Sequence, residues 1–204
     1  VDVWTGYAVN VISKNGDRKI VRGPQTVLLD YDQTLEEVQL STGRPKNTNN
    51  LIKTVYLRHE NNKVSDLVEV ETKDFVKCMV KVSYCVNFEV EHENKWFNVN
   101  NYVKYLCDRE RSLLKRAVKQ YTIEEFYQHY SDIVRNVAIA ADEENNTNGR
   151  FFPENGMIVY DCEVLGFQVE EEIEDMLTAH QREMVQNSLD LTNAEKRVAI
   201  VEKL

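Results

Sequence analysis

The chain has 204 residues, a mass of 23.8 kDa and a formal net charge of −9, which allow one or two domains with a proper hydrophobic core. Because the negative charge repels nucleic-acid phosphates and anionic lipid headgroups, we expect neither nucleic acid nor membrane as a direct partner. No apolar run reaches the roughly 18 residues of a membrane helix, and the first residues lack the pattern of a signal peptide. The cysteines and histidines are scattered without metal-ligand spacing, so the thiols are expected to be free and buried.

The first fifty residues predict a small antiparallel β module. Asn15-Gly16 is a strong signal for a tight hairpin turn, and Gly23-Pro24 marks a second corner. Residues 41–46 form a polar exit from the last strand, and residues 47–50 predict a polar linker, so we expect a domain boundary at about residue 50. The predicted strands are residues 7–12, 18–21, 26–29 and 35–40.

The next section continues with strands. Residues 54–57 and 67–71 are predicted strands, and residues 76–88 alternate with period two. This pattern predicts a hairpin or one long bent strand with one face buried and the other mostly wet. The face expected to be buried carries Val76, Cys78, Val80, Val82, Tyr84, Val86 and Phe88.

Two helices follow. An apolar stripe predicts a helix from about residue 98 to residue 120. Thr122 and Glu125 have the spacing of a capping box, which predicts the start of a second helix. Residues 142–150 are acidic and polar, which favours a mobile loop, and residues 158–164 predict another strand.

The last segment, from about residue 170 to residue 204, contains no Gly or Pro and predicts one long helix. One row of side chains recurs at seven-residue intervals, and a second row with the same spacing includes the polar residues His180 and Asn187. We expect this seam to form an interface between copies of the chain. For the two residues nearest the domain, packing on the chain's own domain is an equal alternative. The expected interface residues are Leu177, Met184, Leu191, Val198, Ala194 and Val201.

Catalytic signals are absent. No phosphate-binding glycine loop, zinc-protease motif or nucleophile elbow occurs, so we expect no enzyme activity, no cofactor and no metal site. Asp30 and Asp32 could suggest a carboxylate pair, but a turn between strands is favoured because no partner acid, base or ligand is evident. Glu124 and Glu125 are explained better by helix capping than by acid–base chemistry.

Several motifs in matching order resemble one family. Residues 22–29 (RGPQTVLL) and 40–46 (LSTGRPK) resemble the last wall repeat of the major vault protein family. Five further segments resemble the shoulder domain of that family: residues 70–74, the strand through Tyr84, and three more. These are residues 88–90, 123–126 and 152–156.

This resemblance has implications for fold and function. It implies an α+β chain with a vault-repeat-like β module at 1–50, a shoulder domain at 51–168 and the start of a cap helix at 169–204. The shoulder would be similar to the stomatin–prohibitin–flotillin (band-7) fold, with a mixed sheet, packed helices and a long C-terminal helix. The expected function is a non-catalytic part of a self-assembling, ribonucleoprotein-type shell in the cytoplasm. Its partners would be copies of itself.

Two alternatives stay open. One is a band-7 scaffold that oligomerises at a membrane, and the other is a module that binds partners or cargo through residues 142–150. The chain begins without Met and ends in mid-pattern at Leu204, which favours a piece of a longer protein.

Overall fold

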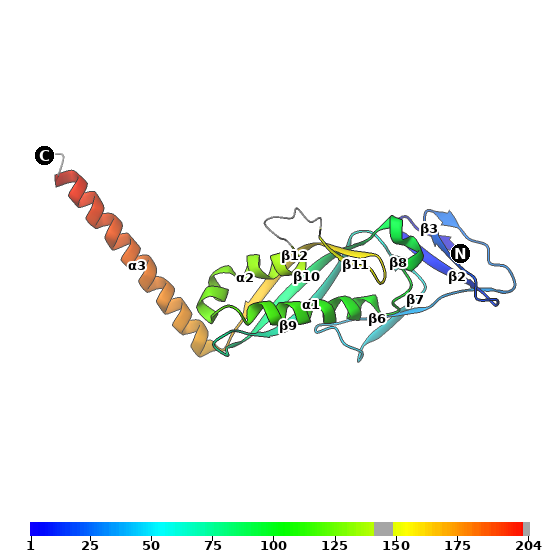
Figure 1. Ribbon diagram of the computed structural model, residues 1–204, viewed down its shortest axis with the longest axis horizontal. Helices are drawn as coiled ribbons and strands as arrows, with labels where there is room; N and C mark the ends of the chain where they lie inside the picture. The colour runs from blue at the N-terminus through cyan, green and yellow to red at the C-terminus, as the bar shows by residue number, and fades with distance from the viewer. Residues whose placement is uncertain (141–148, 202–204) are drawn as a thin grey trace. The chain divides into compact units, whose positions relative to one another are not determined.

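The computed structural model describes residues 1–140 and 149–201. The chain divides into two compact units, Val1–Phe167 and Gln168–Leu204. The first unit contains antiparallel sheets and two α-helices, and the second contains the single long helix α3 (Glu171–Val201; Figure 1). The predicted α+β class is therefore confirmed.

Strand β2 (Tyr7–Ser13) is the centre of the N-terminal sheet. It pairs antiparallel with β3 (Arg18–Arg22), β5 (Gln33–Leu35) and β8 (Leu57–Arg58). The predicted turn between β2 and β3 is confirmed, and Gly16 supplies its positive φ of 88°. A small core of Val3, Val9, Val11 and Val21 lies beneath this sheet.

Two short ladders flank this sheet. Strand β1 (Asp2–Val3) pairs with β4 (Gln25–Thr26), and β6 (Val38–Ser41) pairs with β7 (Leu51–Thr54). Strands that precede residue 50 thus pair with strands that follow it, because β6 binds β7 and β2 binds β8. The division of the chain at residues 50 and 168 stays a proposal.

Three predicted strands differ from the structure. The strand predicted at 26–29 is wrong beyond Thr26, and Leu28 is 88% exposed, so its apolar side chain packs on nothing. The strand predicted at 35–40 is two strands, because the Glu36 N–H donates to the Asn10 carbonyl and draws the chain toward β2. The segment predicted at 54–57 is divided between β7 and β8.

The larger sheet has the strand order β11-β12-β10-β9. Strands β9 (Asn62–Glu71) and β10 (Lys77–Phe88) are antiparallel, as are β11 (Arg150–Phe152) and β12 (Met157–Gln168). The predicted apolar face is buried from Cys78 to Phe88. The expectation of a mostly wet opposite face is wrong at Ser83 and Cys85, which are also buried.

The α-helices α1 and α2 of the first unit begin at polar caps. A 3-10 helix, η1 (Val90–Lys95), precedes α1 (Tyr102–Val118), whose N-cap Asn101 accepts a hydrogen bond from the Lys104 N–H. The predicted start at residue 98 is therefore four residues early. Helix α2 (Ile123–Ala138) has the predicted capping box at Thr122 and Glu125 in full.

Helices α1 and α2 pack on each other, and α1 packs on β9. Of the loop predicted at 142–150, residues 142–148 lie outside the described residues, and Arg150 begins β11.

A buried ion pair fixes α1 to the sheet. Asp66 on β9 is fully buried and accepts hydrogen bonds of 2.7 Å from both the Nε and the Nη2 of Arg111 on α1. The same carboxylate accepts the Lys46 N–H at 3.0 Å, and Arg111 donates to the Lys46 carbonyl at 2.7 Å. Sheet, helix and the chain around Lys46 are thus joined at one charged centre.

Candidate assembly surface

Helix α3 is exposed along most of its length. It runs for 31 residues, and Leu177 is its one buried residue between Glu171 and Val201. Helices of globular proteins usually bury an apolar stripe against their own core, so a long helix with uncovered apolar side chains is a candidate interaction surface.

The residues predicted for the interface differ in exposure. The chain already buries Leu177, which is 5% exposed. The others are open to contact: Met184 is 50% exposed, Leu191 66%, Val198 58% and Val201 72%, and Ala194 is also exposed. That these residues contact another copy stays a prediction.

A second apolar row on α3 was not predicted from the sequence. It consists of Val185, Leu189 and Ile200, which are 60%, 53% and 61% exposed. At about 100° per residue, this row lies about 150° around the helix from the row of Met184 and Leu191. Placing every apolar residue of the segment on a helical wheel would have found it, whereas a search for seven-residue spacing does not.

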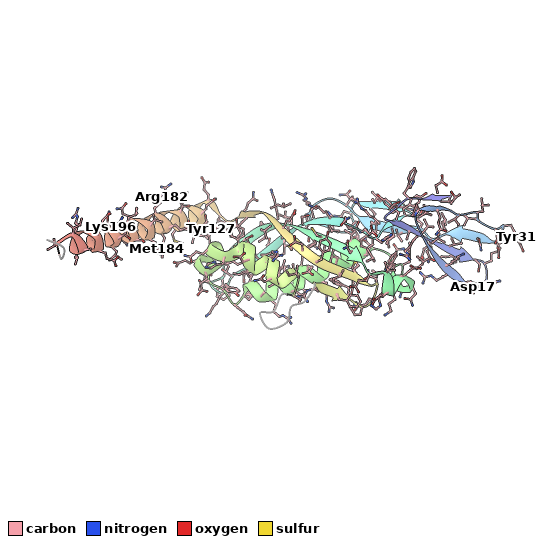
Figure 2. The ribbon with its side chains drawn as sticks, turned by 90° about the horizontal axis from the view of Figure 1, so that it is seen from above. Asp17, Tyr31, Tyr127, Arg182, Met184 and Lys196 are labelled. Atoms are coloured by element: carbon pink, nitrogen blue, oxygen red, sulfur yellow. The ribbon has the colours of Figure 1, made fainter. Side chains whose placement is uncertain are left out.

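The two sides of α3 are visible in Figure 2, where Arg182 and Met184 project to opposite sides of the helix. Two side-chain hydrogen bonds on the helix are local: the Gln186 amide donates to Asp190 at 3.1 Å, and the Thr192 hydroxyl donates to the Ser188 carbonyl at 2.9 Å. The first turn is acidic, with Glu171, Glu172 and Glu174, which the helix dipole stabilises.

The described residues offer no obvious reactive centre. Within residues 1–140 and 149–201, no cluster of His, Cys, Asp or Glu could hold a metal ion. All four cysteines are buried, and burial raises the pKa of Cys78 to about 11 and that of Cys162 to about 12. These thiols are therefore protonated at neutral pH and are poor nucleophiles.

Asp30, Asp32 and Glu125, three of the acidic residues considered from the sequence, lie in local structural elements. The Lys14 N–H donates to the Asp32 carbonyl, and the Asp30 N–H donates to the Gln33 side chain, as in a turn between strands. Glu125 accepts the Thr122 N–H at 3.0 Å, which confirms its capping role.

No helix in the described ranges is both long enough and apolar enough to cross a lipid bilayer.

Comparison with known proteins identifies the family. A family model described as a shoulder domain, that of the major vault protein, matches residues 60–194, about two thirds of the chain. The chain belongs to the major vault protein shoulder-domain family. The resemblance seen in the sequence motifs is thereby confirmed.

Curated major vault proteins match over most of this chain. Major vault protein beta of Dictyostelium discoideum is 28% identical over 178 residues, 86% of this chain and 21% of that protein. The major vault proteins of Strongylocentrotus purpuratus and Mus musculus are 26% and 25% identical, over 88% and 94% of this chain and 21% and 24% of their own lengths. The chain thus spans about a fifth of the length of the relatives it matches.

Proposed function

We propose that this chain is a structural, non-catalytic component of a large self-assembling shell, a vault-like particle of the cytoplasm. Membership of the major vault protein shoulder family supports the proposal. In it, residues 1–50 are a wall repeat, residues 51–168 are the shoulder and residues 169–204 begin a cap helix. The partners are further copies of the same chain, and neither nucleic acid nor membrane is bound directly by this region.

The observation that carries the proposal is the pair of apolar rows on α3. A two-stranded coiled coil needs one seam on each helix. Rows on nearly opposite sides allow each helix to contact a different neighbour on each side. Contacts of this kind join two different surfaces of identical subunits. They form a closed ring when the rotation from one subunit to the next divides 360° evenly. The rows therefore suit a ring of side-by-side helices better than an isolated pair.

The test is negative-stain microscopy of the full-length protein. We expect large hollow particles for the unchanged protein and their loss when Leu191 and Val198 are both changed to Asp. A matched control changes Gln181 and Ser188 to Asp, which adds the same charge at the same spacing on an exposed face between the rows. The control should assemble normally.

The second row has its own test. Changing Val185 and Leu189 to Asp should also abolish closed particles, because each helix then loses one of its two neighbours. Full-length protein that stays monomeric at micromolar concentration would refute the shell. Normal particles from both double variants would remove α3 from the interface.

The alternative of a membrane scaffold is separated by co-sedimentation of the full-length protein with liposomes. We expect the protein to stay in the supernatant, and lipid-dependent pelleting would favour the scaffold.

A further inference from the structure

The charged side chains of α3 are distributed unevenly around the helix. Its two exposed apolar rows, about 150° apart, serve as reference directions. The first row consists of Met184, Leu191 and Val198. The second row consists of Val185, Leu189 and Ile200.

Basic side chains accompany the second row. At about 100° per residue, Arg182 and Lys196 lie within about 30° of the middle of that row. Both residues are exposed. Figure 2 shows Arg182 on the side of the helix opposite Met184, a member of the first row. The side of the second row is therefore positively charged.

Acidic side chains flank the first row instead. Glu195 lies about 40° from the middle of that row on one flank, and Glu183 lies about 80° from it on the other flank. Both residues are exposed. The other Asp and Arg residues between Leu177 and Val201, apart from Arg182, lie about 90–100° from the nearer row and belong to neither; they are Asp190 and Arg197.

These charges are not used inside the chain. Within the part of the chain that the structure describes, Arg182, Glu183, Glu195 and Lys196 form no ion pair. Exposed charges without an internal partner are available to a neighbouring molecule of opposite charge.

A ring of side-by-side copies brings the opposite charges together. Rotation about the ring axis makes the first row of each copy face the second row of the next, with all helices parallel. Residues adjacent in sequence differ by only about 1.5 Å along the helix axis, so Glu183 of one copy lies level with Arg182 of the next. In the same way, Glu195 lies level with Lys196. The flanks also match, because Glu183 and Arg182 fall on one flank of the contact and Glu195 and Lys196 on the other.

We propose that the first row of each copy docks on the second row of the next copy, with Glu183 paired to Arg182 and Glu195 paired to Lys196. This inference rests on the proposed function, since it requires copies arranged side by side. Contact between two first rows would place acid against acid, and contact between two second rows would place base against base. Exposed ion pairs add little affinity, but facing like charges are strongly unfavourable. The charges therefore give the contact its direction.

The test reverses the charge of one side at a time in the full-length protein. Closed particles are counted by negative-stain microscopy at low ionic strength, where charges are least screened. Glu183→Lys with Glu195→Lys makes both sides of α3 positive. Arg182→Glu with Lys196→Glu makes both sides negative. We expect each double variant to form about tenfold fewer closed particles or less, because like charges then face each other at every contact.

Two combinations supply the matched controls. A chain with all four substitutions keeps the original net charge and again places opposite charges across the contact, so it should assemble. Co-expression of the two double variants should also give closed particles, because positive copies can alternate with negative ones. Circular dichroism of each variant checks that α3 stays helical.

Normal particles from either double variant would overturn the proposal. So would a fourfold variant, or a co-expressed pair, that assembles no better than the double variants. These results would leave the shell itself in place as long as the unchanged protein assembles. Failure of the unchanged protein to form particles would instead refute the proposed function.

Discussion

The buried pair of Asp66 and Arg111 gives the sharpest stability prediction. Asp66→Asn keeps the shape of the side chain but leaves the Arg111 guanidinium, 21% exposed, without its carboxylate. It also turns an acceptor oxygen into an NH₂ group facing a donor 2.7 Å away. Breaking one side of a buried pair costs about 3–5 kcal/mol. We therefore expect the free energy of unfolding to fall by about 3 kcal/mol or more.

A matched control exists on the surface. Asp161 pairs with Arg135 at 3.0 Å, but the two side chains are 40% and 48% exposed. Exposed pairs contribute about 0–1 kcal/mol, so Asp161→Asn should change stability little. The assay is urea unfolding of the chain, followed by circular dichroism. An Asp66→Asn loss no larger than that of the control would refute the idea that this ion pair fixes α1 to the sheet.

Three further outcomes can be checked with the same unfolding assay. Thr122→Ala should cost about 1 kcal/mol, because it removes one half of the capping box of α2, and no loss would show that the cap contributes nothing. Phe75 has a φ of 64° and is 79% exposed, so Phe75→Gly should preserve or raise stability by up to about 1 kcal/mol, and a clear loss would reveal a packing role. Two buried groups should give the stability opposite pH dependence. Burial lowers the pKa of His59, so its contribution to the free energy of unfolding is lost as pH falls below 6.5. Burial raises the pKa of Glu110 to about 8, so its contribution to the free energy of unfolding is lost as pH rises from 4.5 through 8. His59→Phe should flatten the acid side of the stability profile and Glu110→Gln the alkaline side, and an unchanged slope in either variant would contradict the assignment.

Local patterns predicted the elements whose signal lies within a few residues. The capping box at Thr122 and the alternation from Cys78 to Phe88 are of this kind, because neighbouring side chains determine them. The apolar run at 26–29 shows the limit of such patterns. Nothing within four residues distinguishes a strand from a loop that leaves Leu28 uncovered.

Contacts between distant segments could not be predicted in the same way. The pairing of Leu57 with Ala8 depends on the register of the N-terminal sheet. The Asp66–Arg111 pair joins residues 45 positions apart and requires β9 and α1 to be in their final packing. His59 also gave no signal, because an isolated histidine acquires its burial and its missing partners only from the surrounding fold.

The seven-residue spacing on α3 has a geometric consequence. An ideal helix turns about 100° per residue, so each step from Leu177 to Met184, Leu191 and Val198 moves about 20° around the axis. Over these three steps the row rotates by about 60°, and straight parallel helices would lose contact along it. Neighbouring helices can keep the row in register only by winding gently around one another with a left-handed sense. A ring built from them would therefore be twisted, and its subunits would be inclined to the ring axis.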